Sequence, residues 1–237
     1  MRLDIYLTEN SLCKSRTAAQ SLIKSGGVSL NGIPCTKPSQ EVGESDTVDI
    51  IGEQLRYVGR GGVKLEAALD KFALDIIGAE CIDIGSSTGG FTDCMLQHGA
   101  AKVWAVDVGR DQLDERLRRD PRVVSMEQTD IRTADLPQVD FIGTDVSFIS
   151  LKLILPHIYR LLKSGGRAAV LIKPQFEAGR SNLSKKGIVR DEKVRLRIRD
   201  EIAEFAQGCG FSVIGTETSP ITGGDGNTEY LMCLEKR

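Results

Sequence analysis

The chain has 237 residues, of which 41% are hydrophobic, and a formal net charge of −2 at pH 7. This length suits one large domain, or a medium domain with a small one, and allows a substantial core. No apolar run approaches the roughly 18 residues that span a bilayer, and the first ten residues, with Asp4 and Glu9, lack a signal-peptide core. We therefore expect a cytoplasmic protein with no membrane partner, in which any basic surface is local.

Cysteine usage indicates a reducing compartment. The six cysteines form no C-x-x-C pair, and only two histidines accompany them. Cys81 and Cys233 lie inside apolar runs that are typical of strands. This pattern predicts reduced thiols, and it favours neither a metal site nor a catalytic thiol.

Residues 1–51 predict a small α+β domain. A helical pattern at 15–24 ends at two consecutive glycines. An Asn-Gly turn at 31–32 between extended pieces is a strong hairpin signal, and residues 48–50 predict a closing strand.

Two stretches of the chain are locally basic. The first 40 residues carry five basic side chains against two acidic ones, and residues 180–199 carry eight against two. Both are candidates for phosphate contacts, which position a nucleic acid without reading its sequence. An ordinary solvated face explains the charge alone equally well in both places. The polar loop at 181–187 is expected either to stay in solvent or to close over RNA.

The rest of the chain predicts a second, larger domain. A glycine-rich stretch at 52–62 predicts a linker, and a helix is expected to begin near Lys64 in a domain covering 63–237. The alternating patterns beyond it predict a mainly parallel, doubly wound sheet with helices on both faces. The expected strands are 81–84, 103–107, 123–126, 140–144, 167–173, 211–216 and 229–234, and the expected helices are 89–97, 111–119, 150–163 and 191–207. The last two strands predict a terminal hairpin with an antiparallel edge strand.

The sequence D-I-G-S-S-T-G-G-F-T, from Asp83 to Thr92, predicts a strand, a nucleotide-binding turn and a helix. Glycines let the backbone approach a ligand, and Asp107 follows at the distance that suits ribose hydroxyls. Ser87 stands where a dinucleotide site needs a glycine to admit the pyrophosphate. A nucleoside without phosphates fits better, and S-adenosylmethionine is the favoured cofactor. A dinucleotide and an unliganded tight turn remain the alternatives.

Polar residues follow several of the predicted strands, where ligands of such sheets bind. Aspartates 83, 107, 130 and 145 lie at successive strand ends, and Lys173 ends a five-residue apolar run. A single aspartate would be an unremarkable helix cap, but four in succession indicate a site. Lys173 is the most unusual of these residues, although its side chain could also extend to the surface.

The motifs together resemble the TlyA family of ribosomal RNA 2′-O-methyltransferases, also called hemolysin A-like proteins. The resemblance covers nearly the whole chain, and it rests on the order of the motifs. They are R-L-D-x-x-L, S-R-x-x-A-x-x-L-I-x-x-G-x-V, G-R-G-G-V-K-L, D-I-G-S-S-T-G-G-F-T, T-D-V-S-F-I-S, L-I-K-P-Q-F-E and G-N-T-E-Y. It implies an αL-type RNA-binding domain followed by a Rossmann-like class I methyltransferase domain, similar to the FtsJ/RrmJ enzymes, with a seven-stranded, mainly parallel sheet.

The resemblance also implies site residues. The catalytic K-D-K-E tetrad of the family maps onto Lys64, Asp145, Lys173 and Glu229. The S-adenosylmethionine positions map onto Asp83, Gly85, Ser87, Thr88, Gly89, Gly90, Phe91, Thr92, Asp107 and Asp130. The basic residues expected to contact RNA are Arg2, Lys14, Arg16, Lys24, Arg56, Arg60, Lys185 and Lys186.

The implied activity is 2′-O-methylation of a cytidine in ribosomal RNA, with the 50S subunit and its 23S rRNA favoured and 16S rRNA left open. A non-catalytic RNA-binding or ribosome-assembly factor is the alternative, and a membrane-lytic hemolysin or a nicotinamide-dependent oxidoreductase is less favoured. A ribose hydroxyl is a poor nucleophile, so a positioned group must assist it. Lys173 is expected either to deprotonate that hydroxyl or to orient it and stabilise its developing negative charge.

Overall fold

The computed structural model describes the whole chain except residues 14, 25, 44, 51–55 and 224–225. It contains two compact units, Met1–Arg56 and Tyr57–Arg237. Of the expected linker at 52–62, residues 52–55 lie outside the described residues, and Arg56 belongs to the first unit. The remainder, from Tyr57 onward, belongs to the second unit, in which the Tyr57 side chain is buried.

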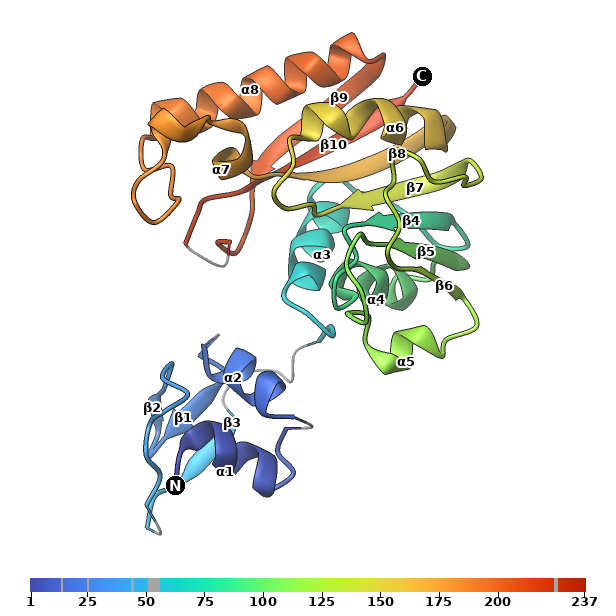
Figure 1. The fold of residues 1–237 in the computed structure, drawn as a ribbon. Helices are drawn as coiled ribbons and strands as arrows, with labels where there is room; N and C mark the ends of the chain where they lie inside the picture. Colours follow the sequence, from blue (N-terminus) through green and yellow to red (C-terminus); the bar gives the residue numbers. More distant parts are fainter. Residues whose placement is uncertain (14, 25, 44, 51–55, 224–225) are drawn as a thin grey trace. The chain divides into compact units, whose positions relative to one another are not determined.

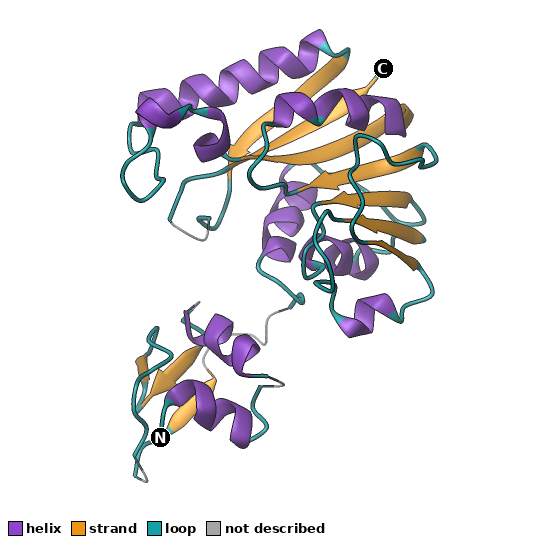
Figure 2. Ribbon diagram, in the orientation of Figure 1, coloured by secondary structure: helices purple, strands orange, loops and turns teal. Residues whose placement is uncertain are grey.

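The first unit contains two helices and a three-stranded antiparallel sheet (Figures 1 and 2). Its elements are α1 (Leu3–Glu9), α2 (Arg16–Lys24), β1 (Val28–Leu30), β2 (Ile33–Pro34) and β3 (Val48–Ile50), with the strands in the order β2-β1-β3. The predicted hairpin is confirmed. Asn31 and Gly32 have φ values of 53° and 77°, the positive values that a type I′ turn requires.

Helix α1 is an element that the sequence pattern does not predict. Leu3, Ile5 and Leu7 alternate along the chain, which gives no helical signal. Leu3 and Leu7 are nevertheless fully buried, because residues four apart share one face of a helix. They form the core of this unit with Ile23 and Val28 from the neighbouring elements.

The second unit contains a seven-stranded sheet in the order β6-β5-β4-β7-β8-β10-β9. The strands are β4 (Glu80–Ile84), β5 (Lys102–Val106), β6 (Val123–Met126), β7 (Val139–Thr144), β8 (Leu162–Ile172), β9 (Phe211–Thr218) and β10 (Tyr230–Lys236). The five neighbouring strands β6, β5, β4, β7 and β8 run parallel to one another, which confirms the predicted mainly parallel α/β fold.

The terminal hairpin is confirmed, and its edge strand β9 pairs antiparallel with β10. The reversed strand β10 lies inside the sheet, antiparallel to both β8 and β9, and β9 forms the edge. The physical reason is burial. Residues 230–234 of β10 are all buried and suit an inner position, whereas most of β9 is partly exposed.

Helices cover both faces of the sheet (Figure 1). Helices α3 (Gly61–Lys71) and α4 (Gly90–Gln97) pack on one face, and α6 (Leu155–Leu161) and α8 (Glu192–Gly208) pack on the other. Shorter pieces are α5 (Glu115–Arg118), α7 (Pro174–Glu177) and single 3₁₀ turns at Leu151–Leu153 and Arg180–Asn182. Two neighbouring residues of β4 show the layering, because Cys81 packs with Leu65 of α3 and Ile82 packs with Ile158 of α6.

Two predicted helices are shorter than expected. Of residues 111–119 only Glu115–Arg118 is helical, because Asp111 has a left-handed φ of 53° and the Asp114 side chain caps the helix. Residues 150–163 form a 3₁₀ turn and then α6, and β8 already begins at Leu162. In both places local turns and side-chain caps interrupt an apolar pattern that suggests one continuous helix.

Candidate functional site

Strand β4, the glycine-rich turn and helix α4 form the centre of the candidate site. Gly85 has a φ of 84°, and a Cβ there would lie 2.7 Å from the carbonyl oxygen of Asp145. Only glycine fits, because both the conformation and the space exclude a side chain. Ser87 also has a left-handed backbone, with a φ of 46°. The turn therefore brings backbone atoms close to the carboxyl edge of the sheet.

A cavity of about 630 Å³ lies beside this turn. Its volume is within the range of roughly 300–1,000 Å³ that is typical of small-molecule sites. Asp107 and Asp130 both line it. Among the described residues of the lining, Arg132 is the one cation, and it pairs with Asp130 at 2.6 Å and lowers the pKa of that carboxyl to about 2. Such a lining suits the hydroxyl and amino groups of a nucleoside better than phosphates.

Asp107 follows β5 and is held by two backbone amides. The N–H of Ser87 donates to Oδ2 at 2.8 Å, and the N–H of Gly109 donates to Oδ1 at 2.7 Å. Each carboxylate oxygen keeps a further lone pair, so Asp107 can still accept bonds from ligand hydroxyls. The glycine-rich turn thus fixes the orientation of the carboxylate that the sequence assigns to the ribose.

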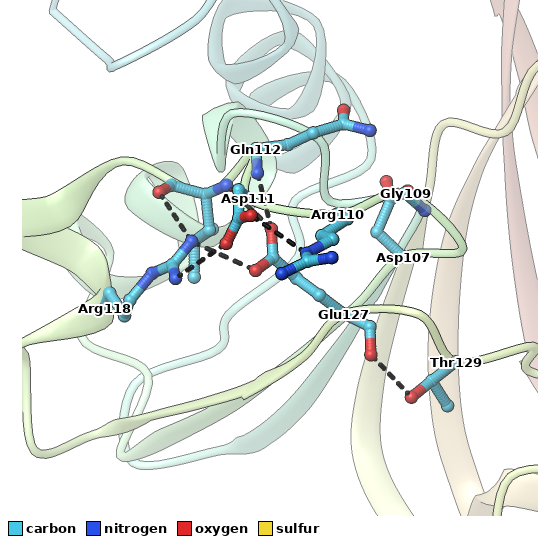
Figure 3. A network of polar contacts seen from close by, with 9 residues as sticks. Asp107, Gly109, Arg110, Asp111, Gln112, Arg118, Glu127 and Thr129 are labelled. Atoms are coloured by element: carbon cyan, nitrogen blue, oxygen red, sulfur yellow. Dashed lines mark hydrogen bonds and ion pairs between the residues drawn. The ribbon is translucent and has the colours of Figure 1, made fainter.

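Glu127 fixes the loop that follows Asp107 (Figure 3). Its Oε1 accepts the N–H groups of Gln112 and Leu113 at 2.6 and 3.1 Å, and its Oε2 pairs with Arg118 at 3.0 Å. Burial alone would raise the pKa of Glu127, but these partners hold it below its usual range. The loop is therefore a preformed wall of the cavity, in which Gln112 lies over Gly109.

Asp83 is fully buried behind the turn. Thr92 donates to its Oδ2 from the backbone N–H at 2.9 Å and from the hydroxyl at 2.7 Å. Its Oδ1 has no hydrogen-bond partner among the described residues. Burial raises the pKa of Asp83 to about 7 in spite of Thr92, and the charges of Asp145 and Asp107 act in the same direction.

Four charged residues form one ion chain of alternating sign. Lys173 Nζ lies 2.6 Å from Asp145 Oδ1, and Lys64 Nζ lies 3.5 Å from Asp145 Oδ2 and 2.7 Å from Glu229 Oε2. Lys64, Lys173 and Glu229 are buried. Lys64 lies on α3. Asp145 and Lys173 directly follow β7 and β8, and Glu229 directly precedes β10. The fold thus brings together the four residues that the sequence singled out, two of which are 165 positions apart.

A second cavity, of about 320 Å³, adjoins this ion chain. Lys64, Asp145 and Lys173 line it, and so does the exposed Arg60. Gly85, Ser87, Asp145 and Ser147 line both cavities. The nucleoside-sized cavity and the ion chain are therefore neighbours that share the glycine-rich turn and the end of β7.

The cofactor residues expected from the sequence divide into two groups. The residues that line at least one of the two cavities are Gly85, Ser87, Thr88, Gly90, Phe91, Asp107 and Asp130. Asp83, Gly89 and Thr92 line neither. Asp83 and Thr92 bond to each other, and Gly89, with a φ of 97°, is the cap from which α4 begins. These three residues can act on a ligand only through the turn that they support.

Three residues of the site carry no role in the sequence-based prediction. Lys173 Nζ donates to the Ser147 hydroxyl at 2.8 Å, and Gln175 Nε2 donates to Glu229 Oε1 at 3.5 Å. Phe148 has a φ of 63° and is 91% exposed, with its ring centroid 5.1 Å from that of Phe176. The T-D-V-S-F-I-S motif contains Ser147 and Phe148, so their position beside Asp145 was the available signal.

The expected RNA-contacting residues of the first unit include a structural pair. Arg2 and Arg16 each place Nε 2.9 Å from the carboxylate of Asp4, which is fully buried. The Arg2 guanidinium holds the pKa of Asp4 well below its usual range, against the cost of burial. Both arginines remain about half exposed, at 43% and 54%. Asp4 therefore fixes two cations at the surface. Lys24, the last residue of α2, is also exposed.

The other expected RNA contacts are placed less uniformly. Lys14 lies outside the described residues, whereas Arg56, Lys185 and Lys186 are exposed. On α8 the expectation of a solvated cationic face agrees with the local pairing. Arg197 pairs with Glu201 at 3.4 Å and Arg199 with Asp200 at 2.7 Å.

The cysteines show no sign of activation. All six are reduced thiols, and burial raises the pKa of Cys81 to about 12 and that of Cys233 to about 11. Neither thiol would ionise near neutral pH, which a nucleophilic role requires. In the part of the chain that the structure describes, no helix has the length and apolar character needed to cross a membrane.

Replacement of Asp83 tests its buried position. Because the pKa of Asp83 is raised on folding to about 7, the free energy of unfolding should fall as the pH rises from about 4 to 7, since the unfolded chain loses this proton first. Asp83→Asn should abolish that slope. Denaturant unfolding, followed by the fluorescence of the single tryptophan, Trp104 of β5, measures it. Asp70→Asn, at an exposed carboxyl of α3, should keep the slope, and an unchanged slope in Asp83→Asn would contradict the assignment.

Comparison with known proteins agrees with this geometry. Residues 57–236 match the FtsJ-like methyltransferase family, and residues 1–48 match the S4 domain. The chain is 47% identical to YqxC of Bacillus subtilis, which is named as a candidate rRNA methyltransferase, over 98% of this chain and 85% of that protein. It is 39% identical to the 16S/23S rRNA (cytidine-2′-O)-methyltransferase TlyA of Mycobacterium tuberculosis, over 98% and 89% of the two chains.

A solved structure shows the same architecture. A protein of Streptococcus thermophilus described as a hemolysin superposes with a TM-score of 0.79 at 45% identity, covering 100% of this chain and 88% of that one. The matches extend over both units, and the tetrad and the glycine-rich turn lie in the matched methyltransferase segment. The chain therefore belongs to the FtsJ-like methyltransferases that carry an N-terminal S4 domain, the family that includes the TlyA and hemolysin A-like proteins.

Proposed function

We propose that the chain transfers a methyl group from S-adenosylmethionine to the 2′-hydroxyl of a cytidine in ribosomal RNA. The observation that carries this proposal is the ion chain of Lys173, Asp145, Lys64 and Glu229 at a cavity that adjoins a nucleoside-sized one. The names of the relatives support the same substrate, because the M. tuberculosis protein is a 16S/23S rRNA (cytidine-2′-O)-methyltransferase.

The larger cavity fits S-adenosylmethionine by its chemistry. Asp107 would accept from the ribose hydroxyls, and Asp130, at the same wall, would lie with the base. Asp83, whose Oδ1 has no hydrogen-bond partner among the described residues, lies buried behind the turn and would act on the cofactor by supporting that turn through Thr92. When bound, the cofactor supplies an electrophilic methyl group on a sulfonium, and the residues of the second cavity present the hydroxyl to it.

Lys173 is best described as an orienting cation. Its Nζ lies 2.6 Å from the Asp145 carboxylate and donates to the Ser147 hydroxyl at 2.8 Å, which are contacts that suit an ammonium group. A charged lysine cannot take the hydroxyl proton, so its ammonium would hold the hydroxyl oxygen and stabilise the negative charge that develops on it, while the proton passes to water. Of the two roles that the sequence left open, this arrangement favours orientation and charge stabilisation.

The rest of the ion chain would fix the lysine and the ribose. Asp145 bridges Lys173 and Lys64, so it restricts both amines at once. Glu229 balances Lys64, which keeps the buried group near neutrality and avoids an unpaired charge. Fixing the reacting groups in this way can supply effective molarities of roughly 10⁵ M or more.

Phe148 offers a surface for a base of the substrate. It follows Ser147, the partner of Lys173, and its ring is almost fully exposed while packing against Phe176. A left-handed backbone conformation at a residue other than glycine costs free energy, and such strain is found mainly at functional sites. Unpaired RNA bases stack on such rings, so we assign Phe148 to stacking on the target nucleotide or a neighbour of it.

Lys173→Ala tests the catalytic assignment. The variant should still fold, at reduced stability because Asp145 keeps only Lys64 as its partner, and should still bind S-adenosylhomocysteine. It should lose methyl transfer to rRNA by roughly 10²–10⁴-fold, because the developing oxyanion loses its cation. Transfer of labelled methyl to unmodified ribosomal subunits measures this. Lys152→Ala, which removes a lysine outside the ion chain, should transfer normally. Retention of most of the rate by Lys173→Ala would remove Lys173 from the mechanism.

Charge reversal at Lys185 and Lys186 tests the basic loop. The double substitution to Glu should weaken RNA binding and reduce the slope of log K against log salt by about 1.4–1.8, because two phosphate contacts are lost. The matched control is Arg116→Glu with Arg119→Glu, which makes the same charge change at exposed positions in α5 and directly after it. Equal effects of the two pairs would mean that only net charge matters. An unchanged affinity and slope would dismiss the contact.

A further inference from the structure

Asn227 is a buried polar residue to which the proposed mechanism gives no role. Its side chain is 2% exposed and forms two hydrogen bonds with the backbone of a distant loop. Its Oδ1 accepts the N–H of Val189 at 3.1 Å, and its Nδ2 donates to the carbonyl of Gly187 at 3.2 Å. One amide thus pairs with the loop much as a neighbouring strand would.

That loop presents the two exposed lysines. The N–H of Gly187 donates to the carbonyl of Ser184 at 2.9 Å, which closes a β-turn with Lys185 and Lys186 at its two central positions. The Ser184 hydroxyl accepts the N–H of Ile188 at 3.1 Å and braces the same turn. Asn227 bonds to Gly187, the last residue of this turn, and to Val189, so it holds the base of the lysine turn.

Asn227 is also two residues from Glu229, the end of the ion chain. Gly223 donates its N–H to the carbonyl of Asn227 at 2.9 Å, and the Gly223 Cα packs directly against the Glu229 carboxylate. Glu229 in turn holds Lys64 at 2.7 Å. A displacement of Asn227 would therefore be transmitted to Glu229 by backbone and by packing.

The other end of the same loop begins at the ion chain. Helix α7 starts at Pro174, directly after Lys173, and its Gln175 donates to Glu229. Glu177 anchors this helix by accepting from the Ser150 hydroxyl at 2.6 Å and from the Leu151 N–H at 2.7 Å. The segment from Lys173 to Val189 therefore leaves the ion chain at Lys173 and is fastened beside Glu229 through Asn227.

We infer that Asn227 is a positioning residue that couples contact of the Lys185–Lys186 turn with RNA phosphates to the alignment of Glu229 and Lys64. The inference rests on the proposed function and deepens it. RNA held by the turn would fix Asn227, and Asn227 would in turn hold the Glu229–Lys64 pair in the position that it has in the ion chain. Asn227 touches neither the substrate nor the reacting atoms.

A double-mutant cycle tests this coupling. Single-turnover methyl transfer at saturating 50S subunits is measured for wild type, Asn227→Ala, the double variant Lys185→Ala/Lys186→Ala, and the triple variant. Asn227→Ala should slow transfer roughly tenfold or more in the wild-type background and by no more than about twofold where the lysines are absent, because contacting groups in one network are not additive. Affinity for S-adenosylhomocysteine should be unchanged throughout.

Controls separate coupling from simple support of the fold. Asn182→Ala removes a side-chain bond of the same loop, from Nδ2 to the carbonyl of Ala178 at 2.6 Å, and should leave transfer near wild type. If Asn227→Ala does not fold, Asn227→Asp keeps the acceptor for Val189, loses the donor to Gly187 and replaces it in the cycle. An equal loss from Asn227→Ala in both backgrounds would overturn the coupling alone. Failure of wild type to methylate either subunit would overturn the proposed function as well.

Discussion

The site depends on the mutual neutralisation of four buried or half-buried charges. Taking a lysine or carboxylate out of water costs several kcal/mol unless a partner of opposite sign lies close. Here Lys64 and Glu229 are 2.7 Å apart, Lys173 and Asp145 are 2.6 Å apart, and the two pairs join through Lys64 and Asp145 at 3.5 Å. Removal of one member would leave a buried charge without its full set of partners. The same ion pairs therefore support both the chemistry and the local stability of this region.

The sheet supplies the framework that makes this chain of charges possible. Strands β4, β7 and β8 run parallel, so Gly85, Asp145 and Lys173 emerge at one edge, while the reversed β10 starts at that edge and delivers Glu229. A position inside the sheet brings the start of β10 next to the end of β8. The inner place of β10 is therefore a requirement of the site as well as of burial.

Much of this could be predicted, and the failures have physical causes. Buried strands and the glycine-rich turn have strong local signals, so β4 to β8, the turn, Asp145 and Lys173 are predicted from the residues themselves. Lys64 and Glu229 are implied only by the resemblance to the TlyA family. Helix α1 is not predicted, because Leu3, Ile5 and Leu7 lie at every second position, which is the spacing typical of a strand. The contacts of Ser147 and Asn227 have no local signal, because their partners, Lys173 and Gly187, are 26 and 40 positions away. Long-range polar contacts of this kind are visible only in the folded chain.

The central claim is that these charges act on a ribose hydroxyl. The most direct measurement is incubation of unmodified 50S and 30S subunits with the protein and S-adenosylmethionine, followed by digestion of the rRNA to nucleosides and mass spectrometry. The account predicts new 2′-O-methylcytidine from 23S rRNA, and a further signal from 16S rRNA would indicate dual specificity. Methylation on a base, or RNA binding without any methylated nucleoside, would contradict it.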